Sequence, residues 1–139
     1  MQYLALPARA LFSLVFIVSS FGHFSPATIR HAAEHGVPFA PIVVPIAGVI
    51  ALAGGLSVLF GWQARVGAWL LVLFLVPVTL FMHNFWAVHD PLQHQLQRVE
   101  FLKNLSLLGG ALLVAYFGSG PVSLDERLPR RHFWLPRHA

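Results

Sequence analysis

Four long apolar runs indicate that this chain is a membrane protein made of helices. They cover residues 4–24, 41–62, 64–85 and 100–118. Each is near the roughly 20 residues that an α-helix needs to cross about 30 Å of hydrocarbon. The segments between them are short and carry proline, glycine, histidine and charge, so no position reads as a linker between domains. The sequence therefore predicts an all-α fold, an integral membrane four-helix bundle.

The composition supports a membrane setting and a single domain. Hydrophobic residues make up 57% of the 139 residues and charged residues only 10%, against about 25% in soluble domains. We expect one transmembrane domain over residues 1–126 and a basic tail over residues 127–139. The first run has no Lys or Arg before it and no small-x-small cleavage site after it, so we expect an anchor rather than a signal peptide.

The distribution of Lys and Arg predicts the orientation. Six arginines fall on the side of the termini, and three basic residues fall on the other side. Because Lys and Arg are concentrated in cytoplasmic segments, we expect both termini in the cytoplasm and a multi-pass protein of the bacterial inner membrane. The first set is Arg9, Arg65, Arg127, Arg130, Arg131 and Arg137, and the second is Arg30, Arg98 and Lys103.

The fourth run opens with polar residues. Glu100, Lys103 and Asn104 precede an almost wholly apolar stretch that ends at Phe117. Leu105 to Phe117, at about 1.5 Å per residue, would cover only about 20 Å, so Lys103 and Asn104 must lie within the outer interface of the bilayer. One interpretation is that Lys103 snorkels outward. The other is that the three polar residues, at i, i+3 and i+4, share a helical face that contacts protein.

Further polar residues end the first and third runs at the same outer level. His23 ends the first run, and His83 and Asn84 end the third. A bundle brings such helix ends together, so we expect a candidate pocket there, although single histidines at helix ends also serve as interfacial or capping groups. The candidate pocket consists of His23, His83, Asn84, Glu100, Lys103 and Asn104.

Small residues predict where the helices approach one another closely. Ala47, Ala51 and Gly55 recur every four residues in the second run, and Gly110 lies seven residues after Lys103 on the same stripe of the fourth. Small side chains allow two helix backbones to come near each other in a membrane. We therefore expect these positions to serve helix packing.

Five short motifs occur at the ends of the apolar runs. They are "FGHF", "LAGGLSVLFGWQAR", "TLFMHNFW", "EFLKNLSLLGGALLV" and "GSGPVSLDE". In this order, over residues 5–126, they resemble the DoxX family of small four-helix bacterial membrane proteins. The resemblance implies a link to redox chemistry, with His23, His83, Lys103 and Asn104 as the polar positions. Family members commonly have an acidic residue before the Gly-Gly of the second run, where this chain has "ALAGG", so either Glu100 takes its place as the partner of Lys103 or the chemistry differs from that of the family.

Two functions follow from the resemblance. In the first, the chain is a subunit of a membrane redox system, and Lys103, Asn104 or a histidine donates to the carbonyl oxygens of a quinone or another small molecule. In the second, it is a non-catalytic anchor or assembly subunit for a partner oxidoreductase. Both require the lipid bilayer and a protein partner or a second copy of the chain. A third, less favoured alternative is a haem-binding bundle in which His23 and His83 ligate the iron between facing helices, although both lie close to helix ends.

Other chemistries find less support in the sequence. The chain has no cysteine, which excludes disulfides, thiol catalysis, and thiol-based or iron–sulfur cofactors. The outer segments carry several histidines that could ligate Zn²⁺ or Cu²⁺, but their spacing matches no metal motif, so we expect no metal site. We find no phosphate-binding glycine loop and no nucleic-acid motif, and we expect no nucleic-acid partner. The histidines in question are His31, His35, His83, His89 and His94.

Overall fold

The computed structural model describes residues 2–128 and contains helices and turns, but no strand, over that range. The elements are η1 (Gln2–Leu4), α1 (Ala5–Gly22), α2 (Pro26–Glu34), α3 (Ala40–Phe60), α4 (Ala64–Met82), η2 (Phe85–Ala87), α5 (Pro91–Phe117) and α6 (Leu124–Arg127). The helices α1, α3, α4 and α5 are long and apolar enough to cross a membrane, which confirms the predicted fold class. Most of the predicted basic tail lies outside the described residues.

The long helices follow the predicted runs closely, except at the start of α5. This helix begins at Pro91 rather than near residue 100, because the Asp90 carboxylate accepts a hydrogen bond from the Gln93 backbone N–H (2.8 Å). Pro91 suits the first turn, where no backbone donor is needed. With 27 residues, α5 is about 40 Å long, so it exceeds the thickness of the hydrocarbon and must tilt or project from it.

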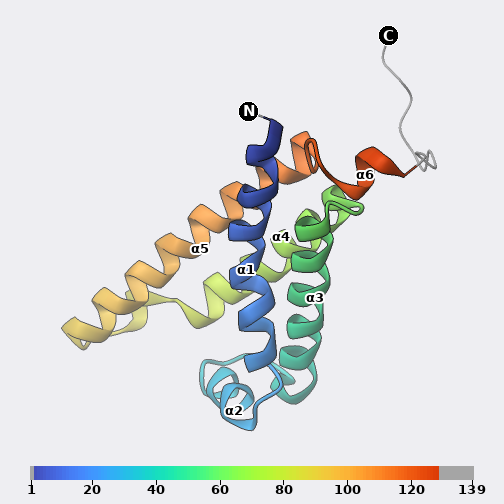
Figure 1. The fold of residues 1–139 in the computed structure, drawn as a ribbon. Helices are drawn as coiled ribbons and strands as arrows, with labels where there is room; N and C mark the ends of the chain where they lie inside the picture. Colours follow the sequence, from blue (N-terminus) through green and yellow to red (C-terminus); the bar gives the residue numbers. More distant parts are fainter. Residues whose placement is uncertain (1, 129–139) are drawn as a thin grey trace.

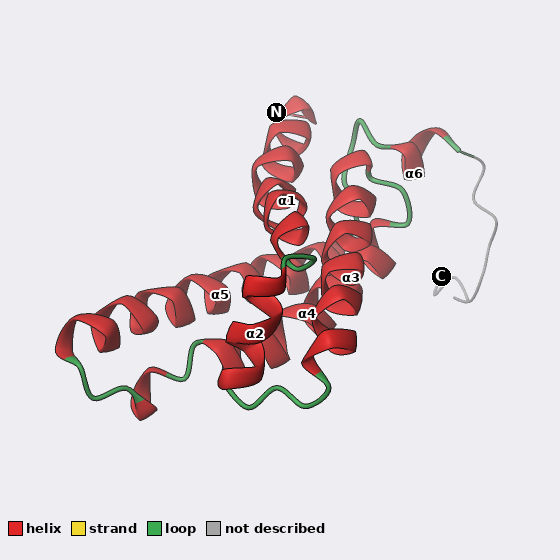
Figure 2. Ribbon diagram, turned by 90° about the horizontal axis from the view of Figure 1, so that it is seen from below, coloured by secondary structure: helices red, strands yellow, loops and turns green. Residues whose placement is uncertain are grey.

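The four long helices form a bundle that is open on one side. α3 packs on both α1 and α4, and α4 packs on α5. By contrast, α1 and α5 approach each other only at isolated points, such as the Phe12 ring beside Gly110. Figure 1 shows α5 strongly inclined to α1 and α3, so that its N-terminal half runs away from them. The short helix α2 packs against α3 at one end of the bundle, as seen from below in Figure 2.

The two ends of the bundle are named here by the predicted orientation. The start of α1, the end of α5 and α6 lie at the same end of the molecule (Figure 1). We call this the inner end, because the Lys and Arg count predicts that it faces the cytoplasm. The opposite end, where α1 finishes and α5 begins, is the outer end. Its position on the outer side of the membrane stays a prediction.

Small residues allow close packing around α3. Ala51 is fully buried, and Ala47 is half-buried against the same core. A Cβ added to Gly55 would lie 3.0 Å from a side chain of α1, and a Cβ added to Gly54 would lie 2.8 Å from the carbonyl oxygen of Gly67 on α4. α3 therefore meets both of its neighbours through positions that tolerate only small side chains.

The segment after α5 folds back over the inner end. The Asp125 carboxylate accepts hydrogen bonds from the backbone N–H groups of Gln63 (2.7 Å) and Ala64 (3.1 Å), so it caps the N-terminus of α4. The Asp125 N–H in turn donates to the carbonyl of Gly61 (2.8 Å), a residue that ends α3 with φ of +63°. Residues 118–127, which we call the C-terminal clasp, thus tie the end of α5 to the turn between α3 and α4.

Candidate functional site

A crevice lies between α1, α4 and α5 near the outer end, on the open side of the bundle. Its volume is about 190 Å³. We call it the outer crevice. Its lining residues are Val15, Phe16, Ser19 and His23 from α1 and its C-terminus, Phe74, Leu75, Val78 and His83 from α4 and its C-terminus, and Lys103, Asn104 and Leu107 from α5.

The structure brings most of the predicted pocket residues together in this crevice. Those that line it are His23, His83, Lys103 and Asn104. Glu100 lies outside the lining, although it forms an ion pair with Lys103. Asn84 lies outside it as well, because the chain turns there into η2 and the Asn84 carbonyl accepts a hydrogen bond from Ala87 (2.9 Å). Because Glu100 and Asn84 do not line it, the crevice is smaller and more apolar than the predicted six-residue pocket.

The polar start of α5 divides into an exposed pair and a buried amide. The side chains of Lys103 and Glu100 are 47% and 42% exposed, so their ion pair is partly solvated and contributes about 0–1 kcal/mol. Asn104 is only 6% exposed. The Lys103–Glu100 pair thus lies toward solvent or lipid headgroups, as expected if Lys103 snorkels outward. Asn104 contacts protein, as expected if the polar face packs on a neighbouring helix.

The Asn104 amide is the unusual group of the site. Within residues 2–128, no hydrogen bond joins its side chain to another residue, and the amide borders the crevice. Among the described residues, the fully enclosed side-chain atoms without a partner are Arg9 Nε and Ser13 Oγ, so the Asn104 amide is open to the crevice. A group of this kind at membrane depth is favoured when it hydrogen-bonds something that enters the cavity.

Hydrogen bonds orient the two histidines of the crevice. His23 Nδ1 lies 3.0 Å from the carbonyl oxygen of Ser19, which can only accept, so Nδ1 carries the proton and donates. His83 Nδ1 donates in the same way to Gln97 Oε1 at 2.8 Å. In the neutral imidazoles the Nε2 atoms are then acceptors. The site therefore presents two imidazole acceptors together with the Lys103 and Asn104 donors.

Sequence reasoning missed the residues that support these histidines. Ser19 lies four residues before His23, and Gln97 lies three residues before Glu100 on the same stripe of α5. The first spacing places Ser19 on the same helical face as His23, whereas Gln97 reaches His83 from the neighbouring helix. The early start of α5 hid Gln97, since the predicted run began after it.

The other histidines of the outer segments are apart from the crevice. The rings of His31 and His35 lie with their centroids 4.2 Å apart, and His35 Nδ1 donates to the His31 carbonyl (2.9 Å). His94 packs edge-on against Phe85. Across residues 2–128, no three His, Cys, Asp or Glu side chains are grouped so as to hold a metal ion.

Comparisons with known proteins place the chain among membrane proteins. The model of the SURF4 family matches residues 1–131. The inner membrane protein YqjF of Escherichia coli is 30% identical over 128 residues, which cover 91% of this chain and 92% of the relative. The inner membrane protein YphA of the same organism is 28% identical over 126 residues, 89% of each chain. No solved structure matches the chain.

A longer eukaryotic relative also matches. The ER-derived vesicles protein ERV29 of Saccharomyces cerevisiae is 27% identical over 125 residues, which cover 90% of this chain. They cover only 34% of the yeast protein, so most of that protein has no counterpart here. With two inner membrane relatives in Escherichia coli and four helices able to span a bilayer, the chain is a multi-pass inner membrane protein.

These matches contradict the resemblance to the DoxX family. The matching model describes the SURF4 family, and the relatives carry no redox name. The predicted membrane redox subunit with its quinone, and the predicted anchor for a partner oxidoreductase, both depended on that resemblance and are withdrawn with it. The motifs were misleading because they are short and draw on the few residue types that membrane spans accept.

Proposed function

The chain belongs to the SURF4 family, and from the site described above we propose that it binds a small amphipathic ligand in its outer crevice. The observation that carries the proposal is the Asn104 amide, which belongs to a buried residue, borders the crevice and has no hydrogen-bond partner among the described residues. A ligand that enters the crevice supplies that partner.

The polar groups of the crevice suggest the chemistry of the ligand. A hydroxyl or amide group can donate to an imidazole Nε2 and accept from the Asn104 amide at the same time. Lys103 offers a further donor at the mouth, although Glu100 already neutralises its charge. We therefore propose a neutral polar group rather than a strongly charged one.

The volume of the crevice suggests how much of the ligand it encloses. At about 190 Å³ it is smaller than the roughly 300–1,000 Å³ of sites that enclose a whole drug-sized molecule. The walls next to the polar groups are apolar and include Phe16, Phe74 and Leu107. We propose that the polar end of the ligand occupies the crevice and that its apolar remainder extends through the open side of the bundle into the lipid.

Mass spectrometry of co-purified molecules tests the proposal. The full chain, its Asn104→Leu variant and its Ser106→Leu variant are purified from the same membranes in mild detergent, and the bound molecules are extracted and identified. Asn104→Leu replaces the amide with an apolar side chain of similar size. Ser106→Leu is the matched control, because Ser106 is exposed on α5 and bonds only to the Leu102 carbonyl (3.1 Å).

The expected result is an amphipathic compound that copurifies with the wild type and the control, and is at least about fivefold depleted in Asn104→Leu, since loss of a buried hydrogen-bonded contact costs about 1–3 kcal/mol. Unfolding curves of all three proteins establish that the variants are folded. The same set of bound molecules in all three folded proteins would refute the proposal.

The predicted protein partner is proposed here as a second copy of the chain that packs on α5. Of the 27 residues of α5 only Asn104 and Ala111 are buried, whereas α3 and α4 bury seven residues each. A Cβ added to Gly109 would meet nothing within 4 Å, so another helix can approach closely there.

Cysteine cross-linking tests this arrangement cleanly, because the chain has no cysteine of its own. Leu113→Cys places a thiol on the exposed face of α5, and Val49→Cys places one on the exposed face of α3. A cross-linked dimer in native membranes is expected from Leu113→Cys only. Equal cross-linking of both variants, or of neither, would contradict the second copy on α5.

A further inference from the structure

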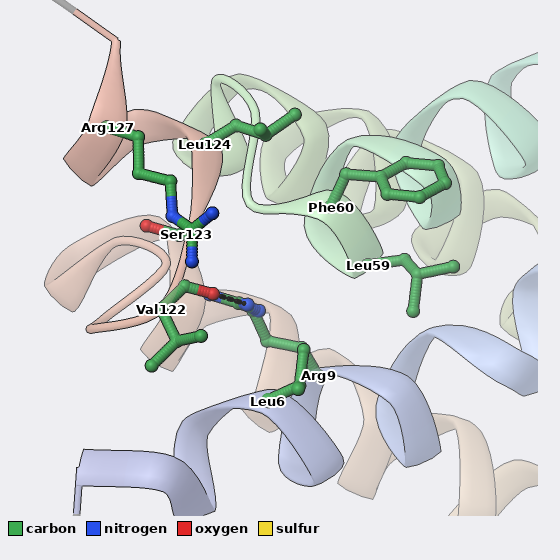
Figure 3. A pocket seen from close by; sticks show the side chains of 8 residues that line it. All are labelled: Leu6, Arg9, Leu59, Phe60, Val122, Ser123, Leu124 and Arg127. Carbon is green, nitrogen blue, oxygen red and sulfur yellow. Dashed lines mark hydrogen bonds between the residues drawn. The ribbon is translucent and has the colours of Figure 1, made fainter.

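A second cavity lies at the inner end, under the C-terminal clasp. Its volume is about 230 Å³, and Figure 3 shows its lining from close by. Arg9 reaches it from α1, and Arg127 reaches it from α6. The remaining lining residues are mostly apolar: Leu6, Leu59, Phe60, Val122, Ser123 and Leu124.

Arg9 is buried in this region without a direct ion pair. It is 5% exposed, and it donates through Nη1 to the Ser119 carbonyl (2.7 Å) and through Nη2 to the Val122 carbonyl (2.6 Å). Its Nε has no partner at all in residues 2–128. The only Lys or Arg ion pair in that part of the chain joins Lys103 to Glu100, so no carboxylate lies within 4 Å of the Arg9 guanidinium. Carbonyl oxygens accept the protons of both Nη atoms, and the Asp125 carboxylate acts on the positive charge only from beyond 4 Å.

The carboxylates nearest to the clasp are already engaged. Both oxygens of Asp125 accept from the N-terminus of α4. Glu126 Oε2 accepts from the Val122 backbone N–H at 2.7 Å. No Asp or Glu follows Glu126 in the sequence. The cavity therefore has two guanidinium groups on its lining and no side-chain carboxylate.

The position and walls of the cavity identify the kind of anion. The cavity lies where α1 begins and α3 ends, which is the level of the lipid headgroups for helices that span the membrane. Leu6 and Phe60, on its rim, are 47% and 56% exposed and extend the apolar surface toward the bilayer. A free phosphate ion would use the guanidinium groups but none of this apolar surface.

We propose that the inner cavity binds the phosphate of an anionic phospholipid from the cytoplasmic leaflet. Arg127 supplies the direct contact, since it is exposed and its guanidinium can pair with phosphate oxygens. Arg9 supplies fixed positive charge from the wall, and the acyl chains lie along Leu6 and Phe60. The lipid would thereby hold the clasp against α1 and bring a negative charge into the cavity, whose lining has no carboxylate.

Native mass spectrometry of the full chain in detergent tests the proposal. The probes are dioleoyl phosphatidylglycerol, dioleoyl phosphatidylcholine and inorganic phosphate, each added separately. The variants are Arg127→Gln and Arg65→Gln. Arg65 is a matched control, because it is an exposed arginine at the same end that does not line the cavity, and its loss changes the net charge equally.

The expected result is that wild type prefers phosphatidylglycerol to phosphatidylcholine, and that Arg127→Gln weakens phosphatidylglycerol binding by about fivefold while Arg65→Gln leaves it unchanged. An equal loss of phosphatidylglycerol binding in the two variants would show that general surface charge accounts for the binding, and would overturn the proposed site. Arg127-dependent binding of inorganic phosphate with no preference for phosphatidylglycerol would identify a free-anion site and overturn the lipid. Unchanged binding in Arg127→Gln would overturn both.

Discussion

The C-terminal clasp allows a quantitative prediction about Asp125. Its carboxylate makes two hydrogen bonds to the first turn of α4, and a hydrogen bond to a charged group contributes about 1.5–3 kcal/mol when it is well shielded. Asp125 is half-buried, so values at or below the lower limit apply. Asp125→Ala is expected to lower the free energy of unfolding by about 2–3 kcal/mol. Asp125→Asn keeps one acceptor oxygen and is expected to lose about half as much.

Denaturant unfolding followed by tryptophan fluorescence measures these changes, and Trp62 in the turn between α3 and α4 lies beside the perturbed cap. Glu126→Ala is the control, because Glu126 is exposed and accepts a single backbone hydrogen bond. It is expected to cost less than about 1 kcal/mol. If Asp125→Ala were no more destabilising than Glu126→Ala, the assignment of Asp125 as the cap of α4 would be refuted.

Three other substitutions have defined outcomes. Gly48→Ala places a Cβ 2.7 Å from the Cβ of His23, so His23 must shift, and loss of the copurified ligand is expected in mass spectrometry of the purified variant. Gly61→Ala is expected to cost at least about 1–2 kcal/mol in denaturant unfolding, because φ is +63° and the new Cβ meets Ser123 at 2.5 Å. Lys103→Met is expected to change the free energy of unfolding by less than about 1 kcal/mol, since its ion pair is exposed, and a larger loss would contradict that description.

The sequence was sufficient to predict the helices, because backbone groups inside a bilayer must be paired within the segment that carries them. It also placed His23, His83, Lys103 and Asn104 at one level, since helix ends of similar length meet at one membrane interface. It could not separate the exposed Lys103 from the buried Asn104. They are neighbours in the chain, and only the packing of α5 on α4 decides which of them faces protein.

The inner end was not predictable from local patterns. Arg9 was used only to infer orientation, although an arginine within an apolar run is itself a signal of a polar partner. Its partners Ser119 and Val122 lie more than a hundred residues away, and no periodicity relates them. The "GSGPVSLDE" motif was recognised as distinctive, but its structural role in capping α4 through Asp125 depends on the tertiary fold.

The most direct test of ligand binding is photo-cross-linking in native membranes. A small diazirine analogue of leucine replaces Leu107, which lines the outer crevice, or Leu105, which is exposed outside it. We predict that only the analogue at position 107 captures a compound of defined mass, and that adding Asn104→Leu abolishes the capture. Identical adducts at positions 105 and 107, or capture at 107 that persists with Asn104→Leu, would contradict a ligand in the outer crevice.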